Sequence, residues 1–113
     1  RVARAGVQVD AARLICRADC LEAQGAAEEN RLMTMEDKLR CRRNVAYAMS
    51  LCTEAVDSLH ALAGANGIYD AYPIQRLFRD QHALSAHIGF SWDAQGAPWG
   101  LVALGGVFSS PTL

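Results

Sequence analysis

Histidines and cysteines are the side chains best suited to chemistry in this 113-residue chain. His82 and His87 lie five residues apart, which places them about 140° apart around a helix, a poor arrangement for chelating one metal ion. Cys16 and Cys20 share a helical face, but no matching His or Cys pair follows at zinc-ligand spacing. We therefore predict no metal site. His60 and His82 are expected to be structural, and the cysteines to be reduced and buried, as is typical of a cytoplasmic protein.

Basic residues are concentrated in one short run, residues 38–43. On a helix these four charges spread around the axis, which favours a solvated or interface surface over a phosphate-binding stripe. Eleven basic residues against twelve acidic ones give a formal charge of −1, which argues against a nucleic-acid partner. No apolar run approaches the ~20 residues that cross a bilayer, so no membrane partner is expected.

The composition is unusually apolar for a chain of 12.2 kDa. Hydrophobic residues make up 51% of it and charged residues 20%, below the usual proportion of charge. The chain also begins with Arg1 rather than Met. We therefore expect a piece of a larger protein, with apolar faces that pack on further domains and on other subunits.

Apolar residues recur at spacings of three and four, which predicts long helices over residues 2–24 and 35–63. Residues 25–30 break this pattern and are interpreted as a connection. Thr34 and Asp37 have the spacing of a capping box at the start of the second helix. The first helix carries two apolar stripes, so more than one neighbour should cover it. The second stripe comprises Val7, Ala11, Leu14, Ile15, Ala18 and Leu21.

Two shorter helices should follow the glycine-rich residues 64–67. Pro73 suits the first turn of one, which should end near residues 87–90. Ser91 should cap another over residues 92–104, which Gly96 and Pro98 are able to bend. No alternating strand pattern appears. The predicted fold is all-α: an up-down bundle of two long and two shorter helices over residues 1–106, followed by a tail over 107–113.

The stretch 64–80, from the glycine-rich turn to an Arg-Asp dipeptide, resembles the C-terminal helical domain of the acyl-CoA dehydrogenase superfamily. In that domain a glycine-rich turn precedes Tyr-Pro, and an Arg-x-x-Arg-Asp motif follows. Here the corresponding residues are Tyr72-Pro73 and 76–80, without a gap. The resemblance implies a helical domain at the C-terminal end of a flavoenzyme of three domains.

Two branches of this superfamily are distinguished by residues that follow and precede the motif. Many dehydrogenases carry a catalytic glutamate eight residues after the Asp, where this chain has Ile88, and a flavin-contacting glutamine where it has Ala61. Flavin-dependent monooxygenases of two-component systems instead carry a histidine seven residues after the Arg-Asp pair. Here that histidine is His87, following Arg79 and Asp80. The chain therefore resembles the 4-hydroxyphenylacetate, hydroxysteroid and dibenzothiophene oxygenases.

This resemblance implies a reaction and its partners. A separate flavin reductase supplies reduced FMN or FAD, which forms a C4a-(hydro)peroxyflavin with oxygen and hydroxylates a small aromatic or polycyclic substrate. His87 would be the catalytic residue at the reactive edge of the flavin, either hydrogen-bonding the peroxide or accepting a phenolic proton. The enzyme is expected to be a cytoplasmic homo-oligomer, a tetramer.

The resemblance also implies where the cofactor binds. Asn66 and Gly67 of the turn approach the flavin phosphate, because glycine permits close approach of the backbone. Arg76 is expected to reach the same phosphate or a neighbouring subunit. Arg79 is a further cofactor-binding candidate, although Arg79 and Asp80 are expected first of all to form an ion pair that stabilises the helix and the turn.

Two alternatives stay open at this point. One is a dehydrogenase-like oxidoreductase whose catalytic base lies elsewhere. The other is a helical oligomerisation domain that catalyses nothing by itself, since the flavin site of this superfamily is completed by other domains. By itself the chain is expected to bind flavin weakly. Neither the substrate nor the choice between FMN and FAD follows from these residues.

Overall fold

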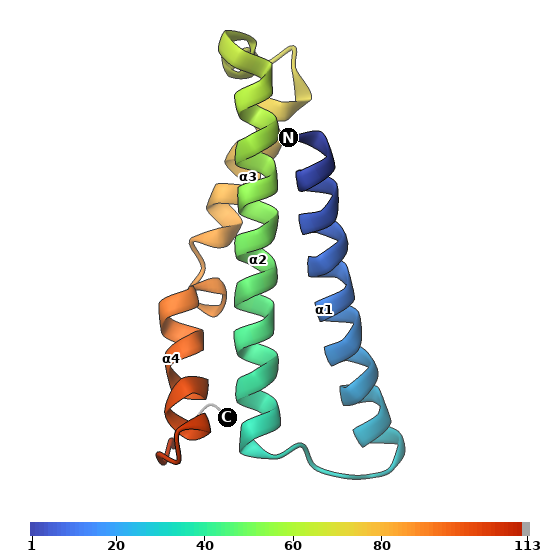
Figure 1. The fold of residues 1–113 in the computed structure, drawn as a ribbon, viewed down its shortest axis with the longest axis vertical. Coiled ribbons are helices and arrows are strands. Elements are labelled where there is room, and N and C mark those ends of the chain that lie inside the picture. The colour runs from blue at the N-terminus through green and yellow to red at the C-terminus, as the bar shows by residue number, and fades with distance from the viewer. Residues whose placement is uncertain (112–113) are drawn as a thin grey trace.

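The computed structural model describes residues 1–111, which contain helices and no strand (Figure 1). The long helices α1 (Val2–Glu28) and α2 (Met35–Ala63) run antiparallel. A short 3₁₀ helix, η1 (Gly64–Ile68), turns the chain at the end of α2. Helix α3 (Pro73–Ser85), the 3₁₀ helix η2 (Ile88–Phe90) and α4 (Trp92–Ala103) then return along α2. The predicted all-α up-down bundle is confirmed.

Helix α2 is the central element of this arrangement. It packs against α1 on one side and against α3, η2 and α4 on the other, as Figure 1 shows. The molecule is elongated, with extents of 50 × 27 × 21 Å. No helix within residues 1–111 is long and apolar enough to span a membrane.

Alanine predominates among the buried apolar residues of the described helices, and Leu39 is the larger side chain among them. On α1 they are Ala5, Ala12 and Ala26, small side chains that let a neighbouring helix approach closely. Larger apolar residues of the second stripe on α1 remain exposed: Val7 by 68%, Leu14 by 67% and Leu21 by 56%. These members of the second stripe are not covered within the described residues, so the expectation that more than one neighbour covers α1 stays a prediction. The buried apolar residues are Ala5, Ala12, Ala26, Leu39, Ala46, Ala48 and Ala55.

Polar side chains cross the α1–α2 contact. Gln8 Nε2 donates a 2.7 Å hydrogen bond to Glu54 Oε2 near one end, and Arg40 forms an ion pair with Glu22 near the other. Fourteen residues separate the two partners on each helix. A slip of the helices would separate both pairs at once, so these contacts set the antiparallel register.

The first helix is longer than predicted, because Gly25 does not end it. Ala26 is buried against the neighbouring helix, which favours continued helix through Gly25. Asn30 takes the positive φ of 54° instead. Its N–H donates to Ala27 O and that of Arg31 donates to Ala26 O, the two hydrogen bonds of a Schellman cap.

The later boundaries differ at one point from the prediction. Helix α3 ends at Ser85 rather than at 87–90, because His87 is extended and its side chain accepts the N–H of Gly89. Ser91 caps α4 as predicted, and α4 continues through Gly96 and Pro98 without a break. Residues 106–110 of the structure have no helix, and residues 112–113 of the predicted tail lie outside the described residues.

The capping box at the start of α2 is confirmed and generates a test. The hydroxyl and N–H of Thr34 donate to Asp37 Oδ2 at 2.7 and 3.2 Å, and the Asp37 N–H donates back to Thr34 Oγ1. These hydrogen bonds hold the pKa of the Asp37 carboxyl below its ordinary value of 3.8. A carboxylate whose pKa falls on folding stabilises the fold above its unfolded pKa, and that stabilisation is lost as pH falls through the folded pKa.

We therefore expect Asp37→Asn to lower the thermal unfolding midpoint at about pH 7, and the difference from the parent to shrink below pH 3.8 and to vanish once the pH is below the depressed folded pKa. Glu36→Gln is the matched control, because Glu36 lies in the same first turn without a side-chain hydrogen bond in the described structure. If both substitutions had equal effects at both pH values, the carboxylate would not be acting through the cap.

Candidate functional site

His87 lies at the junction between α3 and η2, and its side chain is exposed. The backbone N–H of Gly89 donates to His87 Nδ1 at 3.0 Å. A nitrogen that accepts a hydrogen bond carries no proton, so the neutral ring has its proton on Nε2. Phe90 lies beside the ring, with 5.7 Å between ring centroids. His87 therefore presents an N–H donor to an incoming ligand.

Residues 64–68, called the glycine turn from here on, fold as η1 at the end of α2. Gly67 is the buried residue of this segment, and its carbonyl oxygen lies 3.1 Å from Nε2 of His60. Asn66 is exposed, and its side-chain amide makes no hydrogen bond to any described residue. The turn thus has an anchored glycine and an available amide, which fits the proposed contact with a cofactor.

The basic residues of α3 differ from the prediction. Asp80 pairs with Arg76, with Nε 3.4 Å from Oδ2, and not with Arg79. Residues four apart on a helix share a face, whereas neighbours in sequence diverge by about 100°. The expected Arg79–Asp80 pair is therefore wrong. Arg79 is exposed and has no ion pair or hydrogen bond within the described range, so it is the arginine available to an anionic ligand.

The predicted site residues do not converge on one cavity. The glycine turn precedes α3 in the chain and His87 follows it, with Arg79 on the helix between them. The thirteen residues of α3 span about 20 Å at ~1.5 Å per residue. A ligand that contacts both ends must therefore be long, or the two ends serve different ligands.

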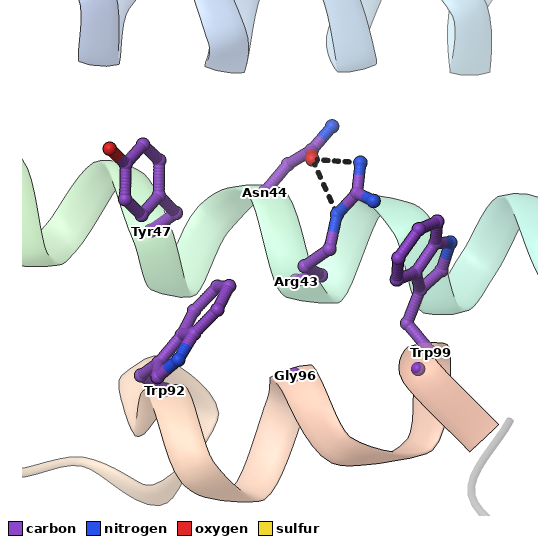
Figure 2. Close-up of a pocket in the computed structure, with 7 residues that line it drawn as sticks. Arg43, Asn44, Tyr47, Trp92, Gly96 and Trp99 are labelled. Atoms are coloured by element: carbon purple, nitrogen blue, oxygen red, sulfur yellow. Dashed lines mark hydrogen bonds between the residues drawn. The ribbon is translucent and has the colours of Figure 1, made fainter. Parts of the chain in front are cut away.

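A pocket of about 510 Å³ lies elsewhere, between α2 and α4. Figure 2 shows Trp92 and Trp99 projecting from α4 toward α2, with Gly96 between them. The guanidinium of Arg43 lies 3.9 Å from the centroid of the Trp99 ring and donates to Asn44 Oδ1. None of the predicted site residues lines this pocket. The lining residues are Arg43, Asn44, Tyr47, Trp92, Gly96, Trp99 and Gly100.

The cysteines are free thiols, but they are less buried than predicted, and Cys20 is exposed. Alanine rather than cysteine fills the α1–α2 contact, which leaves the thiols at its margins. Burial, with Asp19 nearby, raises the pKa of the Cys16 and Cys41 thiols, so both are weak nucleophiles at neutral pH. Within residues 1–111, no three His, Cys, Asp or Glu side chains are placed to hold a metal ion.

Sequence reasoning missed the residues that orient the histidines. Gly89 holds His87, and His60, interpreted from sequence as structural, contacts the glycine turn. Residues seven apart share a face only within one continuous helix, and α2 ends between His60 and Gly67, so their contact does not follow from the spacing. The sequence does hold a signal for Gly89: a glycine two residues after a histidine leaves room for the imidazole to contact the glycine N–H.

Comparison with known proteins identifies the family. Residues 1–92 match the family described as "Acyl-CoA dehydrogenase, C-terminal domain". The chain belongs to this family. The predicted superfamily is therefore confirmed over most of the acyl-CoA dehydrogenase C-terminal domain described here, including the glycine turn, α3 and His87.

Two curated relatives are oxygenase components. The chain is 36% identical over 109 residues to that of the FADH(2)-dependent resorcinol hydroxylase of Rhizobium sp. (strain MTP-10005), covering 93% of this chain and 27% of that protein. It is 37% identical over 93 residues to that of p-hydroxyphenylacetate 3-hydroxylase of Acinetobacter baumannii, covering 82% and 22%. The chain therefore spans about a quarter of the length of these relatives.

Solved structures agree on the fold. The 3-HSA hydroxylase from Rhodococcus sp. RHA1 superposes with a TM-score of 0.91 at 22% identity, covering 98% of this chain and 29% of that one. XiaF from Streptomyces sp., solved in complex with FADH2 and glycerol, superposes with a TM-score of 0.90 at 26% identity, covering 98% and 28%. The helix arrangement is thus that of the corresponding part of these proteins.

The contact between Gly89 and His87 can be tested directly. A Cβ at Gly89 would lie 3.0 Å from His87 Nδ1. We expect Gly89→Ala to rotate the ring and remove the N–H donor to Nδ1, so that the proton distributes between both ring nitrogens. NMR chemical shifts of the imidazole nitrogens measure this change. Gly100→Ala is the control, because a Cβ there meets nothing within 4 Å. An unaltered His87 spectrum in Gly89→Ala would contradict the assignment.

Proposed function

We propose that this chain is the helical C-terminal part of a reduced-flavin-dependent monooxygenase that hydroxylates a small aromatic or polycyclic substrate. The observation that carries the proposal is His87, an exposed N–H donor placed seven residues after the Arg79-Asp80 dipeptide. Two relatives above 35% identity, named as oxygenase components of aromatic hydroxylases, support the same reading. Ile88 and Ala61 stand where many dehydrogenases of the superfamily carry functional residues, which disfavours dehydrogenation.

His87 acts through Nε2. Its Nδ1 is occupied by the Gly89 N–H, so the neutral ring offers a donor at Nε2 and no free acceptor. The geometry therefore favours a hydrogen bond from Nε2–H to a cofactor or substrate oxygen over acceptance of a phenolic proton. A fixed donor of this kind needs no reorganisation when negative charge develops on that oxygen.

The residues of the glycine turn and α3 fit an anionic cofactor. Asn66 has a free amide and Arg79 has a free guanidinium, and both side chains are exposed. Arg76 is compensated by Asp80 and contributes less charge. When bound, reduced flavin supplies the two electrons needed to transfer one oxygen atom of O2 to the substrate and reduce the other to water.

We infer that the flavin is FAD rather than FMN. The glycine turn and His87 are separated by the length of α3, about 20 Å, and a dinucleotide is the flavin long enough to contact both ends. The relatives point the same way, since one is named as FADH(2)-dependent and XiaF was solved with FADH2.

The partners follow from the same proposal. A flavin reductase supplies the reduced cofactor, and the enzyme is a homotetramer of the cytoplasm. Exposed Val7, Leu14 and Leu21 on α1 support burial against other protein surfaces. Free thiols support a reducing compartment.

The reaction can be tested in the enzyme that carries this chain, supplied with reduced flavin, oxygen and a phenolic substrate. We expect His87→Ala to lower the hydroxylation rate roughly a hundredfold, because a donor at the reacting oxygen is lost. His87→Gln should recover part of the rate, since its amide N–H occupies a position close to Nε2. His82→Gln, on α3 five residues before His87, is the control. An unchanged rate in His87→Ala would rule out the assigned role.

The choice of FAD is tested separately through the glycine turn. Asn66→Asp keeps the side-chain shape but adds a negative charge at the end of α3 that, by this proposal, a dinucleotide reaches from His87 and a mononucleotide does not. We expect the dissociation constant for reduced FAD to rise about tenfold, with that for reduced FMN nearly unchanged. Asn30→Asp, the same substitution at the other end of the bundle, should alter neither. Equal weakening of both flavins by Asn66→Asp would contradict the FAD assignment.

A further inference from the structure

His60 makes a close contact with the glycine turn. Its Nε2 lies 3.1 Å from the carbonyl oxygen of Gly67, and a carbonyl oxygen only accepts, so Nε2 carries the proton and donates. Gly67 is buried although its neighbours in the turn are exposed. A carbonyl in that position needs a partner from the protein, and His60 supplies it.

The contact depends on Gly67 having no side chain. A Cβ at this position would lie 2.9 Å from Nε2 of His60, and two further ring atoms would lie 3.2 and 3.3 Å away. The imidazole edge therefore occupies the space that any other residue would fill. Gly67 and His60 are matched to each other, which explains the glycine at a position whose φ is not in the left-handed region.

The ring of His60 is in turn held by α3. It stacks on Phe78 with 4.2 Å between centroids and 29° between planes, and Phe78 also contacts His82 at 4.4 Å. His82 Nε2 donates to Asp57 Oδ1 on α2 at 2.8 Å. These three rings, called the histidine–phenylalanine row, join α2, α3 and the glycine turn.

The row also determines which way α3 faces. Phe78 and His82, four residues apart, share the helix face that meets α2. Arg79 then projects about 100° from Phe78, toward solvent. The orientation of α3 and the position of Asn66 are thus set by a common group of contacts.

We propose that His60 is the positioning residue for the cofactor end of this site: its hydrogen bond to Gly67 and its stack on Phe78 hold Asn66 and Arg79 in one arrangement. The inference rests on the proposed function, because it takes the glycine turn to bind flavin. His60 itself touches neither flavin nor substrate. Its effect is on cofactor affinity, not on the oxygen-transfer step at His87.

Two substitutions separate the parts of this role. His60→Phe keeps the stack on Phe78 and removes the donor to Gly67. His60→Gln keeps an N–H donor close to the Nε2 position and removes the ring. His82→Phe is the control, because it changes the far end of the row without touching the turn.

Hydrogen exchange of the backbone amides of residues 64–69 is the first measurement. We expect His60→Phe to speed exchange there about tenfold, because the buried carbonyl loses its partner, and His60→Gln to restore most of the protection. His82→Phe should leave these amides unchanged. Unchanged exchange in His60→Phe overturns the positioning role.

Flavin binding and turnover in the full enzyme are the second measurement. His60→Phe should raise the dissociation constant for reduced FAD about tenfold, with His60→Gln close to the parent and hydroxylation at saturating flavin unchanged in both. Faster exchange with unaltered flavin affinity would keep the anchor but refute the turn as a flavin site, so the two proposals fail separately. A turnover rate that falls at saturating flavin would refute a role confined to positioning.

A third measurement uses the unsubstituted protein, so that the result does not depend on a variant folding. The Nε2–H proton of His60 should be visible by NMR and protected from exchange with water, because it is held on a buried carbonyl. A His60 ring proton that exchanges as fast as that of a free imidazole would overturn the proposal.

Discussion

The close approach of α1 and α2 over alanine is the constraint on which the rest of the structure depends. Ala5 and Ala12 of α1 and Ala48 and Ala55 of α2 are buried, so small side chains rather than a large apolar core dominate this contact. Small side chains interlock weakly, so they do not by themselves fix the register in which the two helices align along their axes. Gln8–Glu54 and Arg40–Glu22 provide that register through polar pairing. Once α2 is fixed in this way, its other face is the surface on which α3, η2 and α4 pack.

Helices α3 and α4 pack on this face of α2 through polar and aromatic contacts. Gln81 Nε2 of α3 donates to Thr53 Oγ1 at 3.0 Å, and His82 donates to Asp57, both on α2. Tyr47 of α2 meets Trp92 of α4 with 5.8 Å between ring centroids. None of these contacts needs a continuous apolar core, which explains how a thin layer of helices is held with its large apolar residues outside. The site residues on α3 inherit their orientation from this face of α2.

How far the sequence predicts this arrangement depends on whether the signal is local. The capping box at Thr34 and the cap at Ser91 are local hydrogen bonds, and both appear where predicted. Gly25 does not end α1, because burial of Ala26 outweighs the low helix propensity of one glycine, about 1 kcal/mol. The pairing of Asp80 and the partner of His60 depend on helix rotation and on a chain reversal. Neither is visible in residue spacing.

The exposure of His87 has a consequence for how this site can work. A hydrogen bond donated from Nε2 competes with water as long as the ring is exposed, and it contributes little under those conditions. The same hydrogen bond stabilises a negatively charged oxygen strongly once water is excluded and the surrounding dipoles are held in place. Within residues 1–111, the N–H of Gly89 orients the His87 ring, but the ring stays exposed to water. Because this chain corresponds to about a quarter of its relatives' length, we expect the excluding surfaces to come from protein beyond these helices. On this view, substitutions at Gly89 change the direction of the donor, whereas substitutions in the covering surface change its strength.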